Sequence, residues 1–268
     1  MQNRLRARLA QARAERRGVM LGFLPAGYPD PERFLAAAGA AFEAGLDALE
    51  VSMPGPAPEL DGPLIKAAAQ QASQHLGSIA EAVELAARAR QLPGDSLIAL
   101  AHVRTLENMP IDHFLDAIAA ADVDGVLLPQ HTVADQLAVG LQARERNIEP
   151  VIFLHLQEDL GVIAASALHD PLIYLQSADL RTGDPFNPAK AVERLGELAD
   201  ALAGRPYSVC VGFGVRDHGD VQKLMAAGAD GAIIGTRLVS AADEGPAAVA
   251  AIVDEVAPAL VRRDGPRS

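Results

Sequence analysis

The sequence predicts an α/β fold in which eight parallel strands, each followed by a helix, close into one barrel. Short apolar runs alternate with Ala-rich segments whose apolar residues recur at three-and-four spacing, as in crossover helices. There are eight such runs, the number of strands in a closed barrel of this type. One turn recurs before three of the runs, as expected of a repeated unit. Together these observations predict a (β/α)8 TIM barrel, with an N-terminal capping helix.

The eight runs have the apolar character of strands in a parallel sheet. They are residues 19–24, 48–51, 97–101, 125–128, 151–154, 172–175, 208–211 and 231–234. Segments between them that are long enough for crossover helices are residues 31–44, 110–121, 133–146, 188–203 and 218–227. An open doubly wound sheet also alternates strand and helix, but it typically carries a Gly-x-Gly-x-x-Gly turn after its first strand. This sequence lacks that turn, which favours the closed barrel.

The repeated turn occurs in residues 43–50, 121–128 and 227–234. In each case a helix is expected to end, a small residue and an Asp follow, and the chain enters an apolar run. The same connection is therefore used three times.

The composition favours one acidic globular domain. A chain of 268 residues with 50% hydrophobic content can bury a large core, and no linker divides it, so we expect residues 1–268 to form a single TIM-barrel domain. The chain has 23 Lys and Arg against 35 Asp and Glu, a balance that repels nucleic acid. An anionic substrate would need a local site built from backbone N–H groups.

The N-terminus alternates charge with Leu and Ala at helical spacing and contains no signal-peptide core. With no apolar stretch of about 18 residues anywhere, we expect a cytoplasmic protein that does not enter a membrane. The Arg-rich first helix is expected to cap the barrel, and a helix lying on a membrane surface is the alternative. The lone cysteine, Cys210, excludes an internal disulfide and is expected in the core.

Two carboxylates are candidates for acid/base chemistry. Glu50 interrupts an apolar strand at the end where barrels place catalytic groups, and apolar neighbours raise a carboxyl pKa. The alternative is an inward carboxylate paired with Arg or Lys. Asp61 follows a Pro-dense loop at residues 54–58 and precedes Gly-Pro, so a helix N-cap is its simpler interpretation.

Glycine-bearing turns follow the sixth, seventh and eighth strands, where barrels commonly bind phosphate through backbone N–H groups. The turns are Thr182-Gly183, Gly212-Phe-Gly214 and Gly235-Thr236. The alternative is that each glycine only relieves a tight turn. The loop at residues 177–187 is a candidate lid. Lysines stand only at 66, 190 and 223, in helical segments, which disfavours a Schiff-base mechanism.

Over nearly the whole chain the sequence resembles the tryptophan synthase alpha subunit family. The resemblance is carried by residues 22–30, 45–51, 60–63, 209–215 and 228–236. It implies a carbon–carbon lyase that cleaves indole-3-glycerol phosphate to indole and glyceraldehyde 3-phosphate, without a cofactor. Monomer is the state that the resemblance implies.

The resemblance also implies residue roles. Glu50 would protonate the indole ring carbon and handle the side-chain hydroxyl proton, while Asp61 would accept from the indole N–H. Side chains expected to wall the indole pocket are Phe23, Leu127, Tyr174 and Phe213. Residues expected to bind phosphate are Gly183, Gly214, Gly235 and Thr236, the last replacing the usual Ser.

The loops depart from the family. Gly55-Pro-Ala-Pro58 replaces an aromatic-Ser-Asp-Pro loop that includes an Asp used to contact the beta subunit, so we expect weak coupling to a beta partner or none. Leu180 stands in place of a glycine, beside an added Arg181, which favours altered closure or an altered substrate. A non-catalytic relative that binds a phosphorylated ligand or modulates a partner is a second hypothesis.

Three histidines are expected near consecutive strand ends: His102, where the family commonly has Tyr, His131 and His155. With Glu158 or Asp61 they could form a zinc site for metal-assisted aldol chemistry on a sugar phosphate. The sequence lacks regular ligand spacing, so separate polar roles at the rim are favoured and no metal is expected.

Overall fold

The computed structural model describes residues 2–55, 61–107, 109–176, 188–212, 214–215 and 217–261. Eight parallel strands close into a barrel in chain order, and β1 pairs with both β2 and β8. The predicted TIM barrel is therefore confirmed. The strands are β1 (Val19–Pro25), β2 (Ala48–Ser52), β3 (Ser96–Leu100), β4 (Gly125–Leu127), β5 (Glu149–Leu154), β6 (Leu172–Gln176), β7 (Ser208–Gly212) and β8 (Gly231–Ile234).

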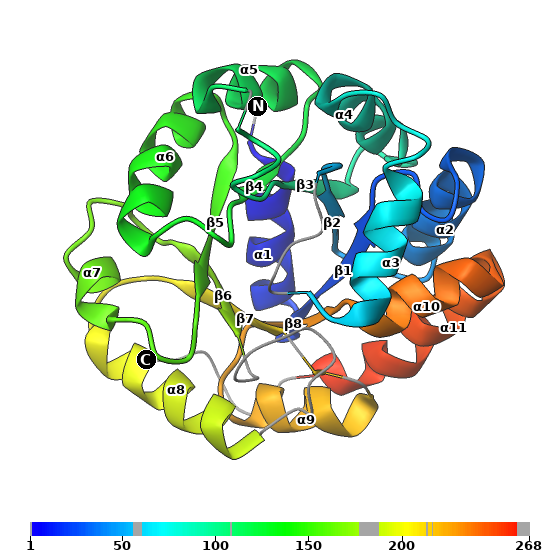
Figure 1. Ribbon diagram of the computed structural model, residues 1–268. Helices are drawn as coiled ribbons and strands as arrows, with labels where there is room; N and C mark the ends of the chain where they lie inside the picture. The colour runs from blue at the N-terminus through cyan, green and yellow to red at the C-terminus, as the bar shows by residue number, and fades with distance from the viewer. Residues whose placement is uncertain are drawn as a thin grey trace.

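The helices surround this ring, with the exception of the first, which lies across its centre (Figure 1). They are α1 (Arg4–Ala14), α2 (Pro31–Glu43), α3 (Pro63–Ala72), α4 (Ile79–Arg88), α5 (Ile111–Ala120), α6 (Val133–Glu145), α7 (Leu160–Ala164), α8 (Pro188–Ala201), α9 (His218–Ala226), α10 (Thr236–Glu244), α11 (Pro246–Val256) and the 3-10 turn η1 (Ala257–Leu260). No helix in the described ranges is long and apolar enough to cross a membrane.

Side chains alternate between two cores along each strand. In β1, Val19 and Leu21 pack in the lumen of the barrel, whereas Met20 and Leu24 pack outward against the helices. Period-two alternation thus separates a lumen core from an outer core. Buried Cys210 belongs to the lumen core, as the sequence predicted.

Helix α1 caps the N-terminal end of the barrel. Its Leu5, Leu9 and Ala12 are buried in the lumen core, so the apolar face of the helix is covered by the barrel. Its Arg4 and Arg6 form ion pairs with buried Asp124 and Glu149, at 2.9 and 2.6 Å. The prediction that the first helix caps the barrel is therefore confirmed, and the alternative of a helix on a membrane surface is wrong.

The repeated turn has a structural purpose that the spacing alone did not reveal. Its aspartates lie buried at the start of the strands, where their carboxylates accept backbone N–H groups of a neighbouring strand. The bonds run to Asp47 from Met20 at 2.9 Å, to Asp124 from Leu97 at 3.0 Å, and to Asp230 from Val209 at 2.8 Å. Charged acceptors strengthen such bonds, so the turns pin the N-terminal rim. The C-terminal ends of the strands form the opposite rim, where barrels of this type carry their active sites.

Candidate active site

Glu50 faces the lumen because of its position in β2. Ala48, two residues earlier, packs in the lumen core, while Leu49 and Val51 pack in the outer core. Glu50 stands in register with Phe23 of β1 and with Ile98 of β3. The lumen setting leaves Glu50 1% exposed.

Burial changes the chemistry of this carboxyl group. Loss of hydration penalises the charged form and raises the pKa of Glu50 to about 8. Among the described residues no hydrogen-bond partner reaches Oε1, and no Arg or Lys forms an ion pair with it. The alternative, in which Glu50 is an inward carboxylate paired with Arg or Lys, is therefore wrong for the described part of the chain. Glu50 is a neutral acid near pH 7 and can donate a proton.

Asp61 lies just before α3 and is 9% exposed. The N-cap of α3 is Gly62, which has no side-chain cap bond, so the capping interpretation of Asp61 is wrong. Asp61 instead acts on Tyr174. Burial first, then the charges of Glu50 and Asp61, raise the pKa of the Tyr174 phenol well above its usual range. The two carboxyl groups and this phenol thus share one region of the mouth.

Aromatic rings line the lumen from this region toward β5. The Tyr174 ring meets the Phe153 ring edge-on with centroids 5.1 Å apart, and Phe153 meets His155 in the same manner at 4.9 Å. Leu127 is buried in the same lumen core, against which Phe23 packs. Phe153 was missed by the sequence reasoning. The signal was available, because Phe153 shares the parity of inward-facing Val151.

The predicted phosphate residues are partly described. Gly235 is the N-cap of α10, whose first residue is Thr236, and as a glycine it has no side chain to cap that helix end. Gly214 follows β7 in the left-handed region, at φ 81°. Glycine adopts that conformation without strain. Predicted site residues Gly183 and Phe213, and the lid at residues 177–187, lie outside the described residues.

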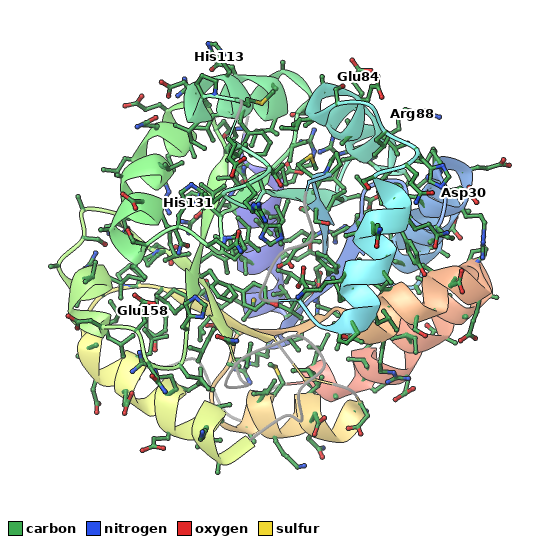
Figure 2. The ribbon with its side chains drawn as sticks, in the orientation of Figure 1. Asp30, Glu84, Arg88, His113, His131 and Glu158 are labelled. Atoms are coloured by element: carbon green, nitrogen blue, oxygen red, sulfur yellow. The ribbon has the colours of Figure 1, made fainter. Side chains whose placement is uncertain are left out.

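The hypothesis that His102, His131 and His155 form a metal site is wrong. Within the described ranges no group of three or more His, Cys, Asp or Glu side chains can hold a metal ion. His155 Nδ1 is instead 2.8 Å from Gln176 Oε1. Figure 2 shows His131 and Glu158 at separate points of the rim, on the loops after β4 and β5.

Comparison with known proteins gives a consistent result. The family described as "Tryptophan synthase alpha chain" matches residues 9–260. A protein of that name from Deinococcus radiodurans is 30% identical over 95% of this chain and 93% of its own length. Another from Nocardia farcinica is 29% identical over 96% and 95% of the two chains. A chain in a structure of Mycobacterium tuberculosis tryptophan synthase superposes with a TM-score of 0.81, at 27% identity and 97% and 99% coverage.

Proposed function

Because the chain belongs to the tryptophan synthase alpha chain family, we propose that it cleaves indole-3-glycerol phosphate, or a close analogue, to indole and glyceraldehyde 3-phosphate. The observation that carries the proposal is Glu50: a carboxyl group buried in the lumen, with its pKa raised to about 8. Such a group holds a proton near neutral pH and can return to that state after each turnover.

The chemistry is a retro-aldol cleavage without a covalent intermediate. Protonated Glu50 donates its proton to the ring carbon that bears the side chain, which makes the ring a cationic electron sink. The Glu50 carboxylate then takes the proton of the adjacent hydroxyl group. As that oxygen forms a carbonyl, the electrons of the carbon–carbon bond return to the ring and indole leaves. One proton enters and one departs, so Glu50 ends as it began.

Asp61 has a complementary role in this proposal. As a carboxylate it accepts a hydrogen bond from the indole N–H, and the bond strengthens when the ring becomes cationic. Its charge already acts on Tyr174, which is itself influenced by Glu50, so one bound ring can lie between both carboxyl groups. Phe23, Leu127 and Tyr174 supply apolar walls for that ring.

The phosphate group is assigned to the rim of β7 and β8. The N-terminus of α10 offers backbone N–H groups at Gly235 and Thr236, and the dipole of the helix favours an anion. Gly214, in the left-handed region after β7, is proposed to offer a further backbone N–H group. Neutral donors explain how a chain of net charge −12 can hold a phosphate ester.

Coupling to a beta chain is expected to contribute little. The sequence Gly55-Pro-Ala-Pro58 lacks the Asp expected for that contact, and the proposal is that cleavage proceeds without a partner. Adding a tryptophan synthase beta chain should leave the rate of indole formation nearly unchanged. Strong stimulation would contradict this part of the proposal.

The test measures indole release from indole-3-glycerol phosphate by the purified chain. Glu50→Gln should lower the rate about 100-fold or more, because an amide cannot transfer the proton. The matched control is Glu84→Gln, since Glu84 is an exposed residue on the outer face of α4 (Figure 2). Equal indole release by wild type and Glu50→Gln would refute the assignment of Glu50.

A further inference from the structure

Polar side chains that the proposed reaction does not use gather at the ends of β3, β5 and β6. They are His102, Thr105, His155 and Gln176. Strand β3 pairs with β2, which carries Glu50, and β6 pairs with β7, so this side of the barrel mouth adjoins the catalytic side at one edge and the phosphate region at the other. A ring anchored by Glu50, Asp61 and its phosphate tail would extend its benzo edge toward these groups.

We propose that this side of the mouth, through His102 and His155, binds a hydroxyl substituent on the aromatic ring of the substrate. The preferred aromatic product is then a ring-hydroxylated indole rather than indole itself. This inference rests on the proposed function and specifies its substrate class.

His102 is the first support. It follows β3 with the parity of Ile98 and Leu100, which pack in the lumen, so the strand directs it to the mouth. It is 7% exposed, and within the described part of the chain its Nδ1 is buried without a hydrogen-bond partner. Nearby Thr105 is 8% exposed, and its Oγ1 is likewise buried without a hydrogen-bond partner among the described residues. Unsatisfied buried polar atoms cost stability and are rare without a ligand or a functional role.

The turn that carries His102 is held against the catalytic side of the mouth. A Cβ placed on Gly55 would lie 2.3 Å from Thr105 Oγ1, so the backbone after β2 packs directly on this turn. Backbone N–H groups of Thr105 and Leu106 donate to the His102 carbonyl at 3.0 and 3.2 Å. The turn is therefore a built feature rather than an open loop.

His155 is the second support. Its Nδ1 lies 2.8 Å from Oε1 of Gln176, a side chain that is 2% exposed. With Nδ1–H donating to this acceptor, Nε2 is the ring nitrogen that remains for a ligand. His155 is also the last ring of an aromatic row in which Phe153 contacts both His155 and Tyr174. This ring nitrogen thus belongs to the last residue of the aromatic row, whose other end is Tyr174 beside the two carboxyl groups.

A hydroxyl group matches these partners. Burial lowers the pKa of His102 to about 4, so its imidazole is neutral at physiological pH and has one donor and one acceptor nitrogen. A ring hydroxyl can donate to one imidazole nitrogen and accept from another. An unsubstituted indole would leave these nitrogens against carbon, and sites built to hydrogen-bond a hydroxyl group discriminate strongly against ligands that lack it.

The experiment uses the reverse reaction, condensation of glyceraldehyde 3-phosphate with indole or with each of the four indoles hydroxylated on the benzo ring. The readout is the ratio of kcat/KM for the best hydroxyindole to kcat/KM for indole. We expect a ratio of about 10 or more in wild type, and a fall of about 10-fold in His102→Phe and in His155→Phe. Loss of folded protein lowers both rates equally, and intrinsic ring reactivity is common to all variants, so neither alters the comparison.

The matched control is His113→Phe, because His113 is exposed on the outer side of α5 (Figure 2) and should leave the ratio unchanged. Gln176→Leu releases His155 from its partner and should also lower the ratio. A wild type that prefers indole to all four hydroxyindoles overturns the inference and leaves the proposed function standing. A ratio that survives both histidine substitutions overturns it equally. Failure to condense any of the five rings contradicts the proposed function itself.

Discussion

The Tyr174 ring lies directly on the backbone of Gly212. A Cβ placed on Gly212 would be 2.4 Å from the phenol oxygen and 2.6 Å from the nearest ring carbon. The two residues belong to adjacent strands, β6 and β7, where Gln176 and Gly212 are in register. Only glycine leaves room for the ring there, so a residue without a side chain determines where an aromatic wall of the site can stand.

Gly212→Ala should therefore impair catalysis more than folding. The added methyl group must displace the Tyr174 ring, and overpacking of this kind costs about 1–3 kcal/mol in the free energy of unfolding. Displacing a wall of the site by about 1 Å can cost on the order of 100-fold in rate. Steady-state kinetics and urea unfolding measure the two effects.

Gly196→Ala is the control for that substitution. Gly196 is exposed in α8, and a Cβ there meets no atom within 4 Å. Alanine is favoured over glycine inside a helix by about 0.5–1 kcal/mol, so this variant should gain stability and keep full activity. Unchanged kinetics in Gly212→Ala would show that Tyr174 does not need its present position.

Glu50 should make stability fall with rising pH. Its pKa is raised by burial from 4.5 to about 8, so the unfolded chain loses this proton first. The contribution of the neutral carboxyl group to stability is full below about pH 4.5 and is lost as pH rises through about 8. Glu50→Gln has no such proton. Its free energy of unfolding, relative to wild type, should increase across this window in urea titrations. A difference that stays constant with pH would contradict the raised pKa.

The same ionisation should appear in the rate of cleavage. Glu50 begins the reaction as an acid, so kcat/KM, which reports ionisations of the free enzyme, should fall as pH rises through about 8, where the neutral form is depleted. The decline should follow a single ionisation in a pH–rate profile. An alkaline limb that persists unaltered in the residual activity of Glu50→Gln would assign it to another group.

Arg6→Leu should destabilise the fold and spare the chemistry. Arg6 pairs with Glu149 at 2.6 Å and with Asp170 at 2.7 Å, at the N-terminal end of the barrel. Glu149 is 3% exposed and keeps one partner, Arg144 at 3.0 Å, so we expect a loss of about 2–3 kcal/mol, below the 3–5 typical of a stranded buried charge. Thermal unfolding and kcat per folded molecule separate the two effects.

Arg104→Ala is the matched control. Arg104 and Glu107 are about 60% exposed and 3.9 Å apart, and such pairs contribute about 0–1 kcal/mol. A change smaller than that is expected. If Arg6→Leu were as mild as this control, the ion pairs beneath the barrel would not contribute to its stability.

The strands were predictable because their signal is local. Each strand of a parallel barrel is buried on both faces, so it appears as a short apolar run, and all eight runs were found with boundaries within two residues. The predicted helical segments also agree with the observed helices, because their spacing is a local signal too. For example, residues 133–146 were predicted and α6 spans Val133–Glu145. Helix α11 was not predicted, because it follows α10 directly, with no strand between the two to mark it.

The site was predictable only in part. Glu50 could be placed in the lumen from its parity in an apolar strand, and its high pKa follows from that burial. Asp61 looked like a helix cap, because Asp before Gly-Pro is a local capping signal, yet the N-cap of α3 is the next residue, Gly62. Its influence on Tyr174 depends on two segments more than a hundred residues apart, which no local pattern encodes.

The sequence by itself determined the closed barrel, the strand that carries Glu50 and the turns at Gly214 and Gly235, since these depend on periodicity and on local backbone freedom. Only the tertiary structure decided which partners the polar groups find. In the structure the α1 arginines form ion pairs with buried carboxylates, and His155 forms a hydrogen bond with Gln176 instead of binding a metal. Glu50 Oε1 has no hydrogen-bond partner among the described residues. Burial and partnership set the pKa of a group, and both arise only when distant strands close around the same lumen.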